Sequence, residues 1–367
     1  MKVNFLDLKP QYISLKQEID DAIANVINET AFIKSKPVSD FEVNFGKYLG
    51  AEHVVSCGNG TDALEISLAA FEIGKGDEVL VPAMSWISTS EVVATAGATP
   101  VFVDIDPRTY CIDISEIEKK ITKRTKAIIP VHLYGHPADM LKIMQMAKKH
   151  DLKVIEDCAQ AHGAEINGKK VGTFGDVATF SFFPTKNLGA FGDAGAIVAK
   201  DKLLRDKISA IANHGQEERH KHILHGRNSR MDGIQAAILN VKLKYLDNWL
   251  LERHSMAKQY TGLLQDVPEI DLPFTESSMT HGWHLFVIKL KSRDQLKTFL
   301  EGKSVQTMIH YPKALPFQPC YSSMNNQVKD FPIARRIQDR ILSLPFYPGM
   351  PMNEIEYVCN CIKKFKD

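Results

Sequence analysis

Short apolar runs alternate with helix-length amphipathic segments along the first part of the chain. Thr61–Ile73 and Ala138–His150 have the length and polarity of helices, and the apolar runs lie at residues 78–82, 99–106, 126–135 and 152–158. Because these runs are apolar almost throughout, both faces of the strands that they predict need a cover of helices. The pattern therefore predicts an α/β fold around a mainly parallel sheet.

The pattern changes twice farther along the chain. Apolar runs at 178–183 and 195–200 lie close enough together to predict the hairpin-like return of a mixed sheet. From Met231 to about Leu263 a long helical pattern leaves the sheet. A smaller α+β unit follows, with a strand at 284–290 and helices at 294–302 and 352–364. We place a boundary near residue 250, which gives a large domain over 1–250, including the N-terminal helical segment, and a small domain over 251–367.

The balance of charge excludes one class of partner. Among 367 residues, Lys and Arg number 45 and Asp and Glu number 44, and no basic stripe is present that could neutralise a run of phosphates. We therefore expect no nucleic-acid partner. The hydrophobic share of 44% is ordinary for a globular protein with a sizeable core, which excludes a disordered or collagen-like chain.

The N-terminal segment and the cysteines indicate where the protein works. Asp7 and Lys9 interrupt the apolar core that a secretion signal requires, and no later run is long and apolar enough to cross a bilayer. The six cysteines are scattered and lack the paired C-x₂-C spacing of a zinc ribbon. We expect a soluble protein of the cytoplasm, with free thiols and with neither a bound metal nor a membrane partner.

The segment CGNGTD at 57–62 leads directly into an apolar helical pattern. Glycines just ahead of a helix expose backbone N–H groups to the positive end of the helix dipole, so a phosphate can bind there, and Thr61 adds a hydroxyl. An ordinary turn with a helix N-cap explains the same residues equally well. The segment lacks the glycine spacing of a P-loop and of a dinucleotide-binding loop, which argues against a nucleotide site.

A second candidate is the carboxylate at the end of the apolar strand predicted at 152–158. Open α/β sheets place ligand-binding groups at this end of their strands. Side chains alternate along a strand, so only one of Glu156 and Asp157 can face such a site, and Asp157 is our candidate. A carboxylate beside a buried ring nitrogen keeps that nitrogen protonated and makes the ring an electron sink. The alternative is that Asp157 caps a turn.

A third candidate is Lys186, in the apolar and glycine-rich segment SFFPTKNLGAFGDAGA directly after a predicted strand. Desolvation in such a place lowers the pKa of a lysine and provides a neutral amine for a Schiff base. Most lysines are solvated surface charges. We expect that of Lys169 and Lys170, which stand together in a polar turn.

Five segments occur in the order seen in one known enzyme family: NGTDAL, VIEDCAQAHGA, SFFPTKNLGAFGDAGAI, GRNSRMDGIQAAIL and IHYPKALPFQPCY. With them nearly the whole chain resembles the DegT/DnrJ/EryC1/StrS family of sugar aminotransferases. The resemblance implies the fold type I aminotransferase architecture, with a mainly parallel, mixed seven-stranded sheet between helices in the large domain. It also implies pyridoxal 5′-phosphate (PLP) as the cofactor, L-glutamate as the amino donor and a homodimer with shared active sites.

The resemblance further implies a role for each matching residue of the cofactor site. Lys186 matches the lysine that binds PLP covalently and then moves a proton, and Asp157 matches the acid that pairs with the pyridine nitrogen. Gln160 matches the residue near the phenolic oxygen, and Trp86 matches the aromatic ring that stacks on the cofactor. The residues that match the phosphate cradle, the last of them from the neighbouring subunit, are Gly60, Thr61, Ser181 and Asn228.

On the substrate side the matching residues are Arg230, His310 and Tyr311. An arginine binds a carboxylate or a phosphate by bidentate hydrogen bonds, so Arg230 fits the amino donor and the sugar nucleotide equally. The segments HGQEERHKHI and GRNSRMD resemble family members that act on 3-keto sugars more than those that make 4-amino sugars. We expect a UDP- or dTDP-linked 3-keto sugar as acceptor, in the biosynthesis of lipopolysaccharide, O-antigen or a related glycan, with a 4-keto sugar nucleotide as the alternative.

Three other functions are compatible with parts of the pattern. A PLP-dependent sugar dehydratase of the same fold has histidine where this chain has Lys186. A nicotinamide-dependent sugar oxidoreductase requires a glycine fingerprint after the first strand, which is missing. A non-enzymatic regulatory protein of the same fold is disfavoured by the intact set of Asp157, Gln160, Ser181 and Lys186. The sequence therefore predicts an aminotransferase.

Overall fold

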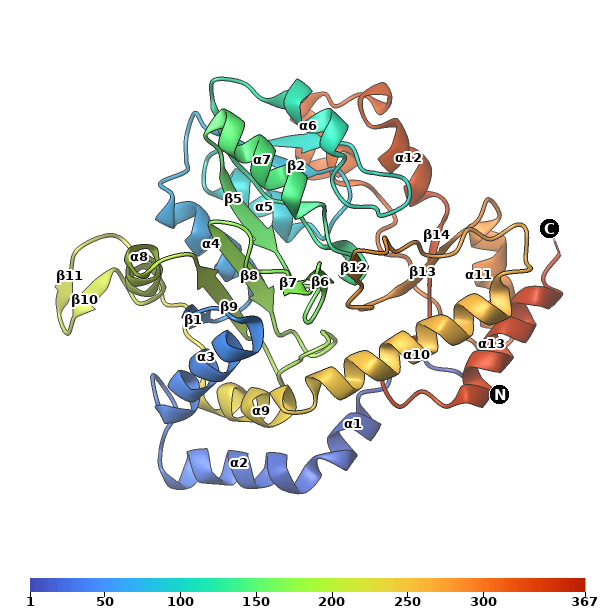
Figure 1. The fold of residues 1–367 in the computed structure, drawn as a ribbon, viewed down its shortest axis with the longest axis horizontal. Coiled ribbons are helices and arrows are strands. Elements are labelled where there is room, and N and C mark those ends of the chain that lie inside the picture. The colour runs from blue at the N-terminus through green and yellow to red at the C-terminus, as the bar shows by residue number, and fades with distance from the viewer. Residues whose placement is uncertain (367) are drawn as a thin grey trace.

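The fold is built around one large sheet, to which a smaller group of C-terminal elements is attached (Figure 1); the structure, a computed structural model, describes residues 1–366. The strands of the large sheet follow the order β1-β9-β8-β5-β4-β2-β3, and only β9 runs antiparallel to its neighbours. Their bounds are β1 (His53–Cys57), β2 (Glu78–Pro82), β3 (Thr99–Val103), β4 (Thr125–Ile128), β5 (Lys153–Asp157), β8 (Val177–Ser181) and β9 (Gly195–Ala199).

This sheet confirms the predicted mainly parallel, mixed seven-stranded architecture and the return between β8 and β9. Four of the five β2 residues and all the β9 residues have apolar or small side chains, and both strands are buried throughout. Strand β1 is absent from the runs that the hydrophobic pattern identifies, because His53 and Ser56 interrupt its apolar character. The observed strands are also shorter than the predicted runs at 99–106 and 126–135, since the last residues of those runs continue as connections at the carboxyl edge.

Helices pack around this sheet and follow from the periodicity of their apolar residues. Helix α3, for example, buries Val38, Phe41, Phe45 and Leu49, which are spaced three or four residues apart, and it ends at Gly50, whose φ of 78° favours glycine. The helices of this part are α1 (Lys9–Ser14), α2 (Lys16–Asn28), α3 (Lys36–Leu49), α4 (Gly60–Ala70), α5 (Ser88–Thr95), α6 (Ile114–Lys120), α7 (Met140–His150), α8 (Lys202–Ala212) and α9 (Gly233–Leu243).

The long helical pattern that begins at Met231 is two helices, α9 and α10 (Leu246–Leu264), where the sequence predicts one. The amides of Lys244 and Tyr245 bond to carbonyls three residues back, which tightens the last turn of α9 and separates it from α10. No glycine or proline marks the break, so the sequence carries no signal for it. Helix α10 then extends away from the large sheet toward the C-terminal elements (Figure 1).

The C-terminal elements surround a second apolar core. They are β13 (Phe286–Lys289) and β14 (Ile341–Leu344), which pair antiparallel, with α11 (Arg293–Gly302) and α13 (Met352–Lys364). Helix α12 (Pro332–Gln338) packs instead against the core of the large sheet through Ala334 and Ile337. Val3 belongs to the same core and forms a bridge with Val305, so the N-terminal residues pack against the C-terminal elements (Figure 1). The predicted boundary near residue 250 falls within α10 and stays a prediction.

Short elements complete the fold. A hairpin of β10 (Gln216–Glu218) and β11 (Lys221–His222) projects from the body beside α8 (Figure 1). A small sheet combines β6 (Glu165–Ile166), β7 (Lys169–Lys170) and β12 (Met279–Thr280), and 3₁₀ turns occur at Leu133–Gly135, Leu315–Phe317, Pro319–Met324 and Val328–Asp330. Within the described residues every helix is too short or too polar to span a membrane. All six cysteines are free thiols.

Candidate active site

A cavity of about 400 Å³ opens at the carboxyl ends of β5 and β8, beside the first turn of α4. Parallel sheets commonly bind ligands at this edge, because loops and helix N-termini converge there. All the predicted site residues except Asn228 and Arg230 line this cavity; they are Gly60, Thr61, Trp86, Asp157, Gln160, Ser181, Lys186, His310 and Tyr311. The chain thus brings together residues that lie up to 251 positions apart, from Gly60 to Tyr311.

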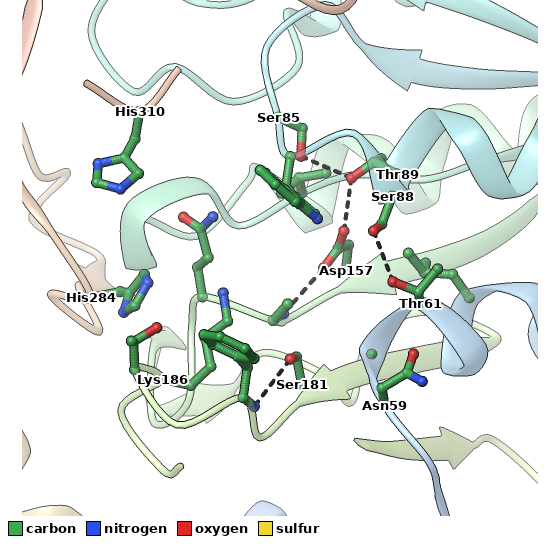
Figure 2. A pocket seen from close by; sticks show the side chains of 18 of the residues that line it. Asn59, Thr61, Ser85, Ser88, Thr89, Asp157, Ser181, Lys186, His284 and His310 are labelled. Atoms are coloured by element: carbon green, nitrogen blue, oxygen red, sulfur yellow. Dashed lines mark hydrogen bonds between the residues drawn. The ribbon is translucent and has the colours of Figure 1, made fainter. Parts of the chain in front are cut away.

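Lys186 extends into the cavity from the loop that follows β8 (Figure 2). The loop is tight, because the amide of Lys186 donates to the carbonyl of Phe183 at 2.8 Å and the amide of Ala190 donates to that of Phe182 at 2.7 Å. Burial lowers the pKa of the Lys186 amine to about 8, against the opposing effect of the Asp157 charge. A useful fraction of the amine is therefore neutral near neutral pH, as a nucleophile or base requires.

Asp157 is buried at the last position of β5, and its two carboxylate oxygens have separate partners. Thr89 Oγ1 donates to one oxygen at 3.0 Å, and the Ala159 amide donates to the other at 3.1 Å. Burial raises the pKa of this carboxyl, while both hydrogen bonds and the charge of Lys186 act to lower it. The site therefore holds a fixed carboxylate that a cationic ring nitrogen would stabilise further.

Glu156 faces away from the cavity, as alternation along β5 requires. Its carboxylate accepts hydrogen bonds from the amides of Gly172, Phe174 and Gly175 and lies 3.2 Å from His132 Nε2. Together with Cys158 this group is compact enough to hold a metal ion. However, His132 Nδ1 already accepts from the amide of Ala138 at 2.9 Å, and the carboxylate is saturated by amides, so the cluster serves as an internal anchor for the end of β5. The expectation that no metal binds stays a prediction.

The first turn of α4 forms the opposite end of the cavity from Lys186 (Figure 2). Asn59 caps the helix by accepting from the amide of Asp62 at 2.8 Å, so the N-cap reading of this segment is correct in part. Thr61 Oγ1 lies 2.8 Å from Ser88 Oγ. A Cβ at Gly60 would meet the Cβ of Ser181 at 2.6 Å, so glycine alone lets the helix start approach β8 so closely. The amides at a helix start and these hydroxyls suit a phosphate.

The remaining wall of the cavity is lined by Trp86, Gln160 and Tyr311. The Trp86 side chain is 56% exposed, and its ring centroid lies 5.7 Å from that of Tyr311. Gln160 is buried and bonds in two directions, since its Oε1 accepts from the Tyr134 amide at 2.7 Å and its Nε2 donates to the Tyr311 hydroxyl at 3.0 Å. Burial raises the pKa of Tyr311, so its hydroxyl is neutral and remains a hydrogen-bonding group.

Several cavity residues are absent from the sequence predictions. Ser85, Ser88 and Thr89 belong to the hydroxyl-rich segment around Trp86, and that composition was a usable signal for a polar site. His284 offers no such signal, because it stands at the first position of a predicted apolar strand, where a lone histidine is weak evidence of function.

Asn228 and Arg230 lie outside the cavity. The Asn228 side chain is exposed and Arg230 is half-buried. The residue between them, Ser229, ties the segment to the start of α4, because its hydroxyl accepts from the Gly58 amide at 3.0 Å and donates to Asp62 at 2.6 Å. The segment is therefore held firmly while its two predicted site residues point elsewhere.

Comparison with known proteins gives a match over nearly the whole chain. The model of the DegT/DnrJ/EryC1/StrS aminotransferase family matches residues 13–363. A pleiotropic regulatory protein of Geobacillus stearothermophilus is 44% identical, over 100% of this chain and 99% of that protein. The dTDP-3-amino-3,6-dideoxy-α-D-galactopyranose transaminase of Aneurinibacillus thermoaerophilus is 43% identical, over 99% of both chains.

Two further matches extend the comparison. The UDP-N-acetyl-3-dehydro-α-D-glucosamine 3-aminotransferase of Acidithiobacillus ferrooxidans is 41% identical, over 99% of this chain and 97% of that protein. The crystal structure of S. venezuelae DesV, solved with a ketimine intermediate, superposes with a TM-score of 0.97 at 38% identity and covers 100% of both chains. The fold and the order of the site segments are thus shared with enzymes of known structure.

Proposed function

Because the chain belongs to the DegT/DnrJ/EryC1/StrS aminotransferase family, we propose that it uses PLP to transfer the amino group of L-glutamate to a nucleotide-linked keto sugar. The observation that carries the proposal is the pairing of Lys186 and Asp157 in one cavity. A buried carboxylate and a lysine whose pKa is lowered to about 8 are the two groups that chemistry on a pyridine aldehyde requires.

The residues present fit PLP along the length of the cavity. PLP supplies an aldehyde for an amine and a protonated ring that accepts the electron pair released at the substrate carbon. We assign Asp157 to the ring nitrogen, Gln160 to the phenolic oxygen and Trp86 to the ring face. We assign the phosphate to the end of the cavity at Gly60, a position where a Cβ would clash with Ser181. The hydroxyls of Thr61 and Ser181 lie at the same end.

Lys186 performs both proton transfers in this account. Its amine would hold the cofactor covalently at rest. As a free amine, Lys186 would take the proton from the α-carbon of glutamate and, with the keto sugar, would deliver a proton to the carbon that receives the amino group. Asp157, fixed by Thr89 and by the Ala159 amide, would keep the ring nitrogen protonated.

We propose a 3-keto sugar linked to UDP or dTDP as the acceptor, in the assembly of lipopolysaccharide, O-antigen or a related glycan. Relatives that are 43% and 41% identical carry names that specify amination at C3 of a dTDP- or a UDP-linked sugar, which supports this choice. The test is to incubate the protein and L-glutamate with matched 3-keto and 4-keto sugar nucleotides and to follow the amino-sugar product by mass. A clear preference for the 4-keto acceptor would contradict the proposal.

A second candidate is a regulatory protein that does not catalyse, which the name of the 44% identical relative favours. The cavity argues for catalysis, because Lys186, Asp157, Gln160 and Ser181 are all present around it. A purified protein that neither contains PLP nor takes it up would favour the regulatory function instead.

We also propose that the protein is a homodimer in which Asn228 and Arg230 of one subunit reach the cavity of the other. Both residues lie outside the cavity of their own chain, on a segment that Ser229 holds in place. The cavity carries exposed aromatic side chains, with Trp86 56% and Phe183 49% exposed, which a second subunit would cover. The six free cysteines support the further proposal that this dimer works in the reducing cytoplasm.

A further inference from the structure

His284 lines the same side of the cavity as Lys186 and His310, away from the helix start that carries Thr61 (Figure 2). It is only 8% exposed, so it is almost enclosed by protein, and it contributes to the lining of the cavity. It stands two residues before β13, in a stretch between the large sheet and the C-terminal elements.

The backbone around His284 is held in place from three directions. The His284 amide donates to the Tyr134 carbonyl at 2.9 Å, and Arg253 Nη1 donates to the carbonyls of Trp283 at 2.9 Å and His284 at 3.3 Å. Asn187, the neighbour of Lys186, donates from Nδ2 to the Gly282 carbonyl at 2.6 Å. The segment that positions His284 is therefore tied directly to the loop that positions Lys186.

The backbone of Trp283, the residue before His284, is strained. Its φ is 45°, in the left-handed region that a bulky residue rarely adopts. The strain is offset by contacts, because its ring stacks on His281 at 4.0 Å and its amide donates to His281 Nδ1 at 2.8 Å. Such strained positions gather at sites where a neighbouring side chain must be placed accurately.

The lack of a partner for one ring nitrogen indicates which tautomer His284 adopts. Its Nδ1 is buried and has no partner within the described residues. Because a buried N–H without a partner costs more than a bare ring nitrogen, the proton resides on Nε2. Since Nδ1 is enclosed and the residue lines the cavity, Nε2–H is the edge that the ring presents to a ligand.

The charges around His284 favour an anionic ligand. Burial lowers the pKa of His284 well below its usual value, and Lys186, Arg253 and the neighbouring histidines lower it further, so the ring is neutral. Arg253 is buried and forms no ion pair within the described part of the chain. Burial lowers its pKa to about 9, which still leaves it positive at neutral pH. The charge of Glu252 opposes this lowering, but it forms no direct ion pair with Arg253 within the described residues. A neutral N–H donor thus lies near a buried cation whose hydrogen bonds go to backbone carbonyls.

We propose that His284 Nε2–H, backed by the charge of Arg253, binds the carboxylate on the reacting carbon of the amino donor. This inference rests on the proposed function. The α-carboxylate is attached to the carbon from which Lys186 removes a proton, so it must lie on the Lys186 side of the cavity, where His284 is placed. His284 is a binding residue in this account, because a ring that stays neutral donates a hydrogen bond and transfers no proton.

The test replaces His284 by leucine, which removes the donor, and by glutamine, whose amide nitrogen stands near the position of Nε2. Bleaching of the cofactor absorption by L-glutamate is followed in single turnovers. In His284→Leu the half-saturating glutamate concentration should rise by about 10- to 100-fold, as expected for a lost hydrogen bond to a charged acceptor, with a smaller change in the limiting rate. His284→Gln should recover most of the affinity. His150→Leu, on the outer helix α7, is the matched control and should behave as the unaltered protein.

A second readout needs no reaction. Glutarate, a dicarboxylate without an amine, is titrated calorimetrically into the PLP-loaded protein and the same variants. We expect binding to weaken in His284→Leu and to return in His284→Gln. Unchanged glutarate and glutamate affinities in His284→Leu, or no recovery in His284→Gln, would overturn the inference. Failure of the unaltered protein to react with glutamate while glutarate binding still depends on His284 would contradict the proposed function alone, and absence of glutarate binding in the unaltered protein would contradict this inference.

Discussion

Lys186 and Asp157 are both buried, which disfavours their charged forms, and the charge of each favours the charged form of the other. Burial lowers the pKa of the Lys186 amine to about 8, and the Asp157 charge works to raise it. The amine is therefore largely neutral above pH 8 and protonated below it. Removing the negative charge of Asp157 leaves burial unopposed, which moves the pKa farther down.

We predict that Asp157→Asn shifts the titration of Lys186 below pH 8. In the cofactor-free protein, competitive acetylation followed by peptide mass spectrometry reports how the reactivity of each lysine depends on pH. The Lys186 peptide of the unaltered protein should gain half its reactivity near pH 8, and that of the variant at lower pH. An upward shift in the variant would show that Asp157 is not the group that holds the charge of Lys186.

Removing the Lys186 amine should have the largest effect on activity. Lys186→Ala should lose transamination by about 10³-fold or more, because one amine serves as base in both half-reactions. It should still bind the aminated form of the cofactor, since the phosphate cradle is untouched. Lys169→Ala, which alters an exposed lysine at the start of β7, is the control and should keep full activity. Turnover by Lys186→Ala within about 10-fold of that of the unaltered protein would remove Lys186 from the mechanism.

Helix α4 is the element that limits the space at the phosphate end. Gly60→Ala would place a Cβ 2.6 Å from the Cβ of Ser181, where the backbone of either α4 or β8 must shift. A strain of that kind costs about 1–3 kcal/mol. We predict that the affinity for PLP falls by about 10-fold or more, in a protein that still folds.

Titration of the cofactor-free protein with PLP measures this affinity, and circular dichroism checks the fold. Gly262→Ala is the matched control, because a Cβ there meets nothing within 4 Å and the position lies inside α10. The control should bind PLP normally and gain about 0.5–1 kcal/mol of helix stability. Equal PLP affinity in both variants would count against a phosphate at the start of α4.

The elements differ in how far the sequence predicts them. Strands with uninterrupted apolar runs, such as β2 and β9, are predicted close to their observed bounds, because burial on both faces leaves a clear pattern. The break between α9 and α10 is not predictable, since every residue around Tyr245 is an adequate helix former. Asp157 follows from alternation along β5, whereas His284 depends on contacts with Arg253 and Asn187 that no local pattern reveals.

The proposed phosphate site is complete only with a second subunit. Asn228 is exposed in the single chain, so its assignment to the phosphate cradle holds only across an interface. The family resemblance assigns Asn228 to the phosphate cradle, whereas within one chain Asn228 lies outside the cavity.

Mixed dimers test this shared site. Lys186→Ala lacks the base, and Asn228→Asp sets a negative charge against the phosphate, so each variant alone should be inactive or weak. In a dimer of one subunit of each kind, one of the two sites has both residues intact. Random reassociation should restore about a quarter of full activity, since half of the dimers are mixed. No recovery in dimers shown to be mixed would place Asn228 in its own subunit's site or in none.

Titration of the purified protein with L-glutamate, followed by visible absorption, tests whether Lys186 and Asp157 support transamination. The account predicts a yellow protein whose absorption bleaches as glutamate is added, with 2-oxoglutarate formed in equal amount, because Lys186 and Asp157 support the first half-reaction without any sugar. A colourless protein that PLP does not reconstitute, or bound PLP whose absorption glutamate leaves unchanged, would contradict it.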